Sequence, residues 1–522
     1  MAEGVLDDLV RVVSCRSCAS EALTLARVGP ACQVGRPLFL ALQDYFRQRG
    51  GVYKLAFGPK VFYVVSCPVV AKHILRTAAL RFDKGVLAEI LEPIMGKGLI
   101  PADYATWQTR RRALVPAFHA AWLSHMVGLF DHCCAPLLAA LDGAAASPGT
   151  AIDMEALFCS VSLDIIGLSV FNYGFGSVTQ ESPVIQAVYR VLREAEHRST
   201  FYFPYWNIPG ASYLVPRQIM FRQDMEAING TLNQLIAAAQ ATAQSTDLAD
   251  LEARDYSRVK DPSLLRFLVD LRGESATNAQ LRDDLMTMLI AGHETTAAVL
   301  TWALFQLSQH PECVAELRAE LDAVLPAAGE KVTYDHVRRM HLTRLCVAES
   351  LRMYPQPPLL IRRALETVEL PQGTAAAAVT LPPGADVFIA VYNIHRSSAF
   401  WGPDADEWRP KRFLEALAPA ADGAGGWAGR APYSPPASGD AGDRSPLYPT
   451  ETGADFAYMP FGGGSRKCIG DQFATMEATV VLARIVHAYD FELVGPPGDV
   501  GMVTGATIHT EKGLRMRVTK RR

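Results

Sequence analysis

The spacing of apolar and polar positions predicts a chain that is mainly α-helical with small β-sheets. Residues 119–275 carry the spacing of helices, and residues 281–307 are expected to form one long apolar helix. A glycine-rich apolar stretch over 82–101 is expected to be a loop. Two stretches alternate with the period of strands. The predicted hairpins span 52–65, with a turn at Gly58 and Pro59, and 491–518, and a further helix runs from Pro68 toward Leu75.

Two segments fall outside this pattern. Residues 1–34 are rich in Arg, Ser, Cys and Ala, which favours an organelle transit segment or, as the alternative, a disordered N-terminal extension. Residues 415–452 are rich in Ala, Gly, Pro and Ser, which is typical of a flexible insertion. Length alone would suit roughly three domains. We expect instead that residues 35–522 form one large helical domain containing this insertion.

The composition excludes several classes of function. The net charge of −4 leaves no basic footprint for nucleic acid. The ten cysteines are scattered along the chain, which indicates a reducing compartment and no disulfide framework. No apolar run reaches the roughly 18 residues of a membrane-spanning helix, so we expect a soluble or peripherally attached protein.

The strongest chemical signal is the stretch Phe461-Gly462-Gly463-Gly464-Ser465-Arg466-Lys467-Cys468-Ile469-Gly470. Cys468 has two basic neighbours, and a helical pattern begins just after it, at Asp471. Positive charge and a helix N-terminus favour the thiolate, which is the form of cysteine that binds a metal. Glycines let the backbone pass close to a flat, bulky partner. The alternative is a buried free cysteine; zinc is disfavoured because no second Cys or His lies at ligand spacing.

The pattern Phe-x-x-Gly-x-Arg-x-Cys-x-Gly in this stretch resembles the haem-binding signature of the cytochrome P-450 family. The resemblance implies the mostly helical fold of that family, with Cys468 as the axial thiolate ligand of a heme b group (iron protoporphyrin IX). An iron held by one cysteine thiolate favours cleavage of the O–O bond of dioxygen. The neighbouring residues that the resemblance assigns to cofactor binding are Phe461, Gly462, Arg466 and Gly470.

The middle of the long apolar helix holds polar residues whose burial costs stability. Ala291, Thr295 and Val299 recur every four residues and share one face, where small side chains leave room for a planar group and a diatomic ligand. The stretch from Ala291 resembles the Ala/Gly-Gly-x-Asp/Glu-Thr-Thr motif of the same family. By that resemblance Ala291 lies against the haem, Thr295 positions protons for iron-bound dioxygen and Glu294 relays them from solvent. A kink with local hydrogen bonds is the alternative for His293 and for the threonine after Thr295.

Basic residues elsewhere are candidates for the haem propionates. Trp107 and Arg111 lie four residues apart and would share a helix face. In the family such a pair, together with an arginine that Arg362 matches, binds propionates through charge-assisted contacts. For the flanking Arg110 and Arg112, a solvated basic face or a docking patch for an acidic electron donor stays open.

Three charged residues resemble a structural network of the family. Glu349 and Arg352 place opposite charges three residues apart in an otherwise apolar helix, and Arg412 matches the third member. Because buried charges need partners, we expect these residues to hold the haem pocket together. A surface ion pair is the alternative for Glu349 and Arg352.

Several stretches are similar to a narrower branch of the family, the plastid carotenoid-ring hydroxylases of plants and algae, and most of all to its B-type subgroup. Ser465 departs from this branch, which usually has proline there. The stretches shared with the branch are 83–87, 93–103, 285–296 and 504–510, and those typical of the subgroup are 192–200 and 426–429.

The resemblance therefore implies a monooxygenase that inserts one oxygen atom of O2 into a C–H bond of an apolar substrate, with a carotenoid β-ring as the expected target. It also implies a chloroplast location, peripheral membrane contact, and an electron donor such as ferredoxin or an NADPH-dependent reductase. Two alternatives stay open. One is an oxygen-independent haem-thiolate isomerase or lyase of lipid hydroperoxides, and the other is a haem-binding protein without catalytic activity.

Overall fold

The computed structural model describes most of the chain in two compact units. The described residues are 37–57, 60–147, 149–180, 183–200, 204–241, 261–272, 277–325, 330–373, 378–419, 425–436 and 446–521, with two short strands near the N-terminus. Unit 1 consists of residues 1–87, 344–468 and 501–511, and unit 2 consists of residues 88–343, 469–500 and 512–522.

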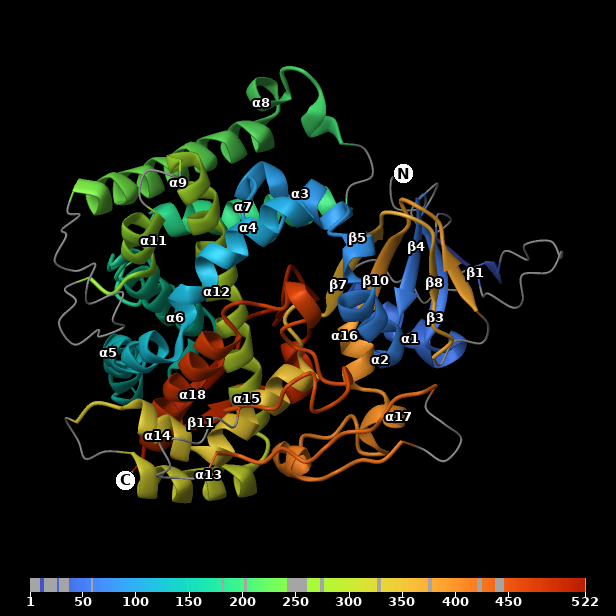
Figure 1. Ribbon diagram of the computed structural model, residues 1–522. Helices are drawn as coiled ribbons and strands as arrows, with labels where there is room; N and C mark the ends of the chain where they lie inside the picture. The colour runs from blue at the N-terminus through green and yellow to red at the C-terminus, as the bar shows by residue number, and fades with distance from the viewer. Residues whose placement is uncertain are drawn as a thin grey trace. The chain divides into compact units, whose positions relative to one another are not determined.

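Unit 1 is built on a sheet of seven strands in the order β2-β1-β3-β4-β10-β7-β5 (Figure 1). β3 and β4 form the predicted hairpin, in which Val52 pairs with Val65. β4 and β10 run parallel, whereas the other neighbouring strands are antiparallel. The strands are β1 (Val10–Val13), β2 (Ala26–Arg27), β3 (Val52–Phe57), β4 (Lys60–Val65), β5 (Phe82–Asp83), β7 (Leu359–Ala364) and β10 (Asp386–Ala390).

Short helices and two small sheets complete unit 1. The side chains of Val65, Ile74 and Leu381, none of them exposed, belong to one apolar cluster that joins the large sheet to these elements. The helices are α1 (Leu38–Arg49), α2 (Pro68–Lys72), α16 (Val391–His395), α17 (Ser398–Trp401) and most of α15 (His341–Met353). The small sheets pair β8 (Val368–Leu370) with β9 (Val379–Leu381), and β12 (Val503–Thr504) with β13 (Ile508–His509).

Unit 2 is a helical bundle with one three-stranded sheet. α12 is its long central helix, and it packs against α6, α9 and α18 (Figure 1). The helices are α3 (Val86–Met95), α4 (Tyr104–Leu114), α5 (Ala120–Ala145), α6 (Met154–Phe171), α7 (Pro183–Thr200), α8 (Ala211–Leu214), α9 (Pro216–Ala241), α11 (Leu264–Arg272), α12 (Asn278–Leu307), α13 (Pro311–Val324), α14 (Tyr334–Arg339) and α18 (Asp471–Ala488). The sheet, in the order β11-β14-β6, contains β6 (Ala151–Asp153), β11 (Tyr489–Leu493) and β14 (Arg515–Lys520).

Three helices of unit 2, α5, α6 and α12, have the length and hydropathy of a membrane span. This corrects the expectation that no apolar run is long enough, because mean hydropathy over a window tolerates the polar residues that interrupt a run. Within the protein, 72% of the apolar window of α6 and 83% of that of α12 is buried, against 39% for α5. Packing in the core therefore explains the apolar character of α6 and α12.

The predicted fold class is confirmed, with one error in its elements. Half of the expected loop over 82–101 is helix, because α3 spans Val86–Met95. Its apolar residues at 87, 90, 91 and 94 recur at helical spacing. Gly85 and Gly96, whose φ angles are +58° and +55°, bound the helix at its two ends.

Some predictions fall wholly or partly outside the described residues. The turn at Gly58 and Pro59 lies outside them, as does the N-terminal segment over 1–34 apart from β1 and β2. In the predicted insertion over 415–452, the described residues include Trp427, which is 2% exposed and packs in an apolar cluster of unit 1. That this insertion is flexible, and that 35–522 is one domain, stay predictions.

Candidate active site

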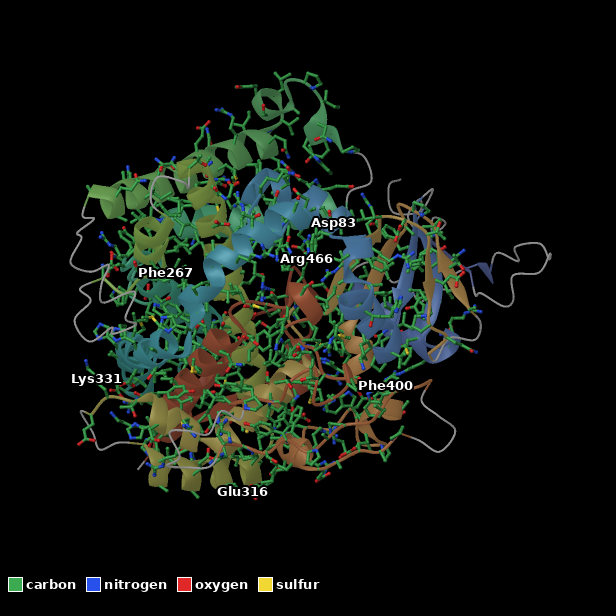
Figure 2. All side chains as sticks on the ribbon, in the orientation of Figure 1. Asp83, Phe267, Glu316, Lys331, Phe400 and Arg466 are labelled. Atoms are coloured by element: carbon green, nitrogen blue, oxygen red, sulfur yellow. The ribbon has the colours of Figure 1, made fainter. Side chains whose placement is uncertain are left out.

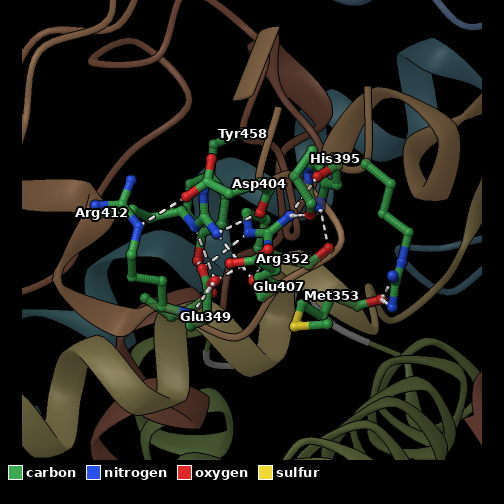
Figure 3. Close-up of polar contacts among 12 residues, drawn as sticks. Glu349, Arg352, Met353, His395, Asp404, Glu407, Arg412 and Tyr458 are labelled. Atoms are coloured by element: carbon green, nitrogen blue, oxygen red, sulfur yellow. Dashed lines mark hydrogen bonds and ion pairs between the residues drawn. The ribbon is translucent and has the colours of Figure 1, made fainter. Parts of the chain in front are cut away.

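A buried ion network anchors the middle of unit 1 (Figure 3). Arg352 Nε lies 2.8 Å from Glu349 Oε2, and Arg412 Nε lies 2.9 Å from Glu349 Oε1. None of the three side chains is exposed. Burial raises the pKa of the Glu349 carboxyl, but Arg352 and Arg412 outweigh it, so this pKa lies below its ordinary value. The predicted network is confirmed, and the surface ion pair is excluded.

His395 connects this network to the segment that leads to Cys468. The backbone N–H of Met459 donates to His395 Nε2 at 2.8 Å, so Nδ1 carries the proton and donates to the backbone oxygen of Arg352 at 3.1 Å. Burial, with Arg352 adding to it, lowers the pKa of His395 to about 3. Tyr458 donates its hydroxyl to the backbone oxygen of Ala348 at 3.0 Å. The ion network and the start of the cysteine loop are therefore held together by a neutral imidazole and a tyrosine.

The loop over 461–468 is tightly turned by its own backbone. The N–H of Cys468 donates to the oxygen of Phe461 at 3.0 Å. Gly464 has a φ of +70°, and a Cβ there would lie 1.9 Å from the backbone oxygen of Leu75. Gly462 also has a positive φ, +73°. Two of the glycines are thus required by the protein's own conformation, and the loop leaves the Cys468 side chain exposed.

Positive charge gathers around Cys468 within unit 1. Arg466 Nη2 lies 3.1 Å from Asp83 Oδ1 (Figure 2). Burial lowers the pKa of Lys84 well below its ordinary value, and Arg362 and Arg466 lower it further, while Asp83 and Cys468 act in the opposite direction. Burial and the Arg466 charge lower the pKa of Arg362 to about 10, which leaves it charged at neutral pH. Two arginines and one lysine therefore share this region with one carboxylate.

This donor set fits a haem. The excess of basic groups suits the two propionate carboxylates, since an anion would relieve the repulsion that adds to burial in lowering the pKa of Lys84 and Arg362. Arg362 is 6% exposed, and its Nη1 donates to the backbone oxygen of Ile361 at 2.7 Å. Within the described residues no three or more His, Cys, Asp or Glu side chains gather as a metal site. The exposed Cys468 thiol supplies one ligand, which is what an iron already held by a porphyrin requires.

In unit 2, the predicted proton-delivery residues lie in the middle of α12. Thr295 donates its hydroxyl to the backbone oxygen of Ala291 at 2.8 Å, which confirms that the two share a face. Glu294 is 9% exposed. His293 Nδ1 lies 2.8 Å from the backbone oxygen of Leu289, within the helix. The helix thus presents a hydroxyl and a buried carboxyl at consecutive positions.

Gly292, a glycine inside an apolar helix, has a packing role. A Cβ at this position would lie 2.3 Å from Ile166 Cδ1, so the glycine lets α12 and α6 approach closely.

Gly470 precedes the first residue of α18 and forms its N-cap, and the predicted start of this helix at Asp471 is confirmed.

The predicted pair on α4 is in contact. Arg111 Cζ lies 5.9 Å from the centroid of the Trp107 ring, over its face. Arg110 is not solvated as one interpretation held: it is 6% exposed and its Nη1 lies 2.9 Å from Oδ1 of the fully buried Asp284. Arg110 therefore belongs to the core of unit 2 and cannot serve as a docking patch, whereas Arg112 is exposed.

Sequence reasoning missed two residues of the site region, Lys84 and His395. Lys84 lies in a stretch that was recognised as typical of the hydroxylase branch, but a lone lysine carries no chemical signature. His395 binds only backbone groups, at Arg352 and Met459. No spacing in the sequence indicates such contacts, so only the three-dimensional structure identifies them.

Comparison with known proteins gives consistent matches along the chain. Residues 21–506 match the family described as Cytochrome P-450. The chain is 53% identical over 496 residues to "Cytochrome P-450 97B2, chloroplastic" of Glycine max, covering 94% of this chain and 84% of that protein. It is 43% identical to "Protein LUTEIN DEFICIENT 5, chloroplastic" of Arabidopsis thaliana, over 92% of this chain and 74% of that protein. It is 41% identical to "Carotene epsilon-monooxygenase, chloroplastic" of the same plant, over 94% and 83%.

Proposed function

The chain belongs to the cytochrome P-450 family, and from that premise we propose that it is a plastid monooxygenase that hydroxylates the ring of a carotenoid. One observation carries the proposal: Cys468 is exposed on a tight glycine loop, within a region where Lys84, Arg362 and Arg466 outnumber the carboxylate of Asp83. This arrangement has the ligand and the counter-charges that a haem needs.

Each candidate residue has a role in this proposal. Cys468 would bind the haem iron, and Ala291 would lie against the ring. Cationic and aromatic side chains would hold the propionates. When bound, the haem supplies the iron centre at which dioxygen is activated. The residues proposed to contact the haem or its propionates are Lys84, Trp107, Arg111, Ala291, Arg362, Phe461, Gly462, Arg466, Cys468 and Gly470.

Thr295 and Glu294 would deliver protons. The overall reaction consumes O2, two electrons, two protons and one C–H substrate, and yields an alcohol and water. Glu294 is 9% exposed, so its carboxyl lies between bulk water and the interior of the helix bundle, where a relay group is needed. The Thr295 hydroxyl now donates to the oxygen of Ala291, and by rotating it would hold a proton toward the oxygen-binding side.

The names of similar proteins support the substrate and the location. One relative is named a carotene monooxygenase and three are named chloroplastic. A carotene ring has no polar group that could form a hydrogen bond with the protein, so the shape of an apolar pocket must position it. The electrons would come from ferredoxin or an NADPH-dependent reductase, and contact with a membrane surface would give access to the apolar substrate.

A pair of variants tests the thiolate. Cys468→Ser is expected to lose the red-shifted Soret band of the reduced carbon monoxide complex and the turnover of carotene. The matched control is Cys346→Ala, which removes a buried thiol of unit 1 away from the loop. If Cys468→Ser kept both the band and the product, the proposal would be wrong.

A second experiment tests the substrate and the proton role. The chain is expressed in bacteria that accumulate β-carotene, and the pigments are separated by chromatography; hydroxylated rings are the expected product. Thr295→Ala is expected to keep its haem spectrum, because its hydroxyl bonds only to its own helix, and to release hydrogen peroxide in place of product. Unchanged product per NADPH in Thr295→Ala would contradict the assigned role.

A further inference from the structure

A line of polar residues crosses the interior of unit 2 next to Glu294. Glu155 and Cys159 lie four residues apart on α6 and so share one face of that helix. Tyr189 comes from α7, and His293 and Glu294 come from α12. Glu155 and Glu294 are each 9% exposed, and His293 is fully buried. Cys159 and Tyr189 are partly buried. Polar side chains that three packed helices bury wholly or partly need a reason, and none of the roles above uses Glu155, Cys159 or Tyr189.

Two contacts join Tyr189 to Cys159 and to His293. The side chains of Tyr189 and Cys159 are hydrogen-bonded to each other. The rings of Tyr189 and His293 pack edge to face, with centroids 5.7 Å apart and planes at 72°. The contacts therefore lead from α6 through α7 to the residue that precedes Glu294.

Electrostatics place both carboxyls near the tyrosine and the cysteine. Burial, and next the Glu155 charge, raise the pKa of Cys159 to about 12, and Glu294 contributes in the same direction. Burial and the neighbouring Cys159 raise the pKa of Tyr189, and Glu294 and Glu155 raise it further. Both groups therefore stay protonated at neutral pH, so each can accept one proton while giving up another.

The outer end of this line is the N-terminus of α6. Asp153 is the N-cap, and its Oδ1 accepts from the backbone N–H of Glu155 at 3.0 Å and from that of Leu514 at 3.1 Å. Asp153 is partly exposed, so this end of the line reaches water. Glu155 follows at once and is the first buried carboxyl.

We propose that Cys159 and Tyr189 relay protons from Glu155, near the surface end of α6, to Glu294 on α12. The inference rests on the proposed function, because the relay would supply the two protons that each hydroxylation consumes. Each step moves one proton. The Glu155 carboxylate takes up a proton from water and passes it to the Cys159 sulfur as the thiol proton passes to the Tyr189 oxygen, and the phenol proton passes to the Glu294 carboxylate. Glu294 thereby regains the proton that it delivered, and Glu155, Cys159 and Tyr189 return to their starting states.

The test measures how much of the NADPH consumed appears in hydroxylated β-carotene, with an NADPH-dependent reductase as donor. Tyr189→Phe and Cys159→Ala are expected to lower this fraction roughly tenfold. This effect is smaller than the about 10²–10⁴-fold that a group transferring the proton directly contributes, because water can partly replace a relay group. The electrons from NADPH that do not appear in hydroxylated product are expected to reduce dioxygen to hydrogen peroxide. Cys159→Ser, which keeps a donor and acceptor, is expected to restore most of the coupling.

Two control variants separate the relay from packing. Tyr489→Phe removes another hydrogen-bonded hydroxyl of unit 2, whose oxygen lies 2.9 Å from the backbone oxygen of Leu138. Cys133→Ala removes a buried thiol of α5. Both are expected to keep the coupling of the wild type. Haem content is checked in every variant by the reduced carbon monoxide spectrum.

The outcomes are distinguishable. If the active enzyme shows equal coupling in the relay variants and the controls, the relay is overturned and the contacts are packing alone. If Tyr189→Phe does not fold, the Cys159→Ala and Cys159→Ser pair decides, and equal coupling in these two overturns the relay. If the wild type converts no carotene while it holds a haem-thiolate, the proposed function fails and the relay falls with it.

Discussion

The buried histidine that connects the ion network to the cysteine loop makes stability depend on pH in a predictable way. The pKa of His395 falls from an ordinary 6.5 to about 3 in the folded protein. Between these values the unfolded chain takes up a proton and the folded protein does not, so lowering the pH favours unfolding. The contribution of neutral His395 is therefore present above pH 6.5 and is lost progressively as the pH falls toward 3.

The size of the effect follows from linkage. A pH of 5 lies about 1.5 units below the pKa of the imidazole in the unfolded chain, and each unit corresponds to about 1.4 kcal/mol of stability. Between pH 7 and pH 5 the wild type should therefore lose about 2 kcal/mol through this residue alone. The cause is geometric: a protonated Nε2 cannot accept from the N–H of Met459, and the positive charge would be buried beside Arg352.

The assay compares urea unfolding of the wild type and of His395→Gln at pH 7 and pH 5, followed by far-UV circular dichroism and by the Soret band. A glutamine is neutral at both values, so the variant lacks this proton linkage. The wild type is expected to lose about 2 kcal/mol more than the variant between the two pH values. The control His132→Gln, at an exposed position of α5, should follow the wild type. An equal loss in the wild type and His395→Gln would refute the reasoning.

Three further substitutions have expected effects on stability. Glu349→Gln should cost about 3–5 kcal/mol in urea unfolding, because it removes the carboxylate that two buried arginines share; Arg412 keeps Asp404 at 3.3 Å, whereas Arg352 loses its carboxylate partner, and a loss below 1 kcal/mol would contradict this. Gly464→Ala should lower the melting temperature and the haem content, since the new Cβ would lie 1.9 Å from the oxygen of Leu75 and φ is +70°; an unchanged melting temperature would count against it. Gly292→Ala should destabilise α12 against α6, and Ile166→Ala in the same chain should recover part of that loss, with a coupling of about 0.5–3 kcal/mol in a double-mutant cycle. Additive effects of those two changes would show that they do not meet.

Local patterns predicted the elements that depend on local physics. The hairpin of β3 and β4 follows from alternation, and the pairing of Glu349 with Arg352 follows from their spacing of three on an apolar helix. Prediction failed where a partner is distant in the chain. For Arg110, the sequence allowed a solvent-exposed side chain, because its buried partner Asp284 lies 174 residues further along the chain. Sequence reasoning assigned Gly292 no role, because the atom that excludes a side chain there belongs to Ile166 on α6.

The helix α3 shows a different kind of failure, in which one signal was outweighed by another. Glycines at 85, 96 and 98 and Pro93 favour a loop, and the sequence was interpreted that way. The apolar spacing within 87–94 favours a helix, and the structure has one. Glycines that flank a short segment mark its ends and carry no information on its interior, so periodicity inside the segment should have decided.

The connection between the ion network and the cysteine loop depends on backbone atoms, and this has a consequence for how the site is built. Within the described residues, Arg352 donates to the backbone oxygens of His395 and Ala405 at 2.7 and 2.6 Å, and the His395 ring in turn accepts from the N–H of Met459. A guanidinium can satisfy several carbonyls at once because its donors are fixed in one plane, whereas a lysine could not reach them together. The carboxyl of Glu349 keeps that plane in position. The acid therefore acts on the loop that presents Cys468 through an arginine and an imidazole, without touching it.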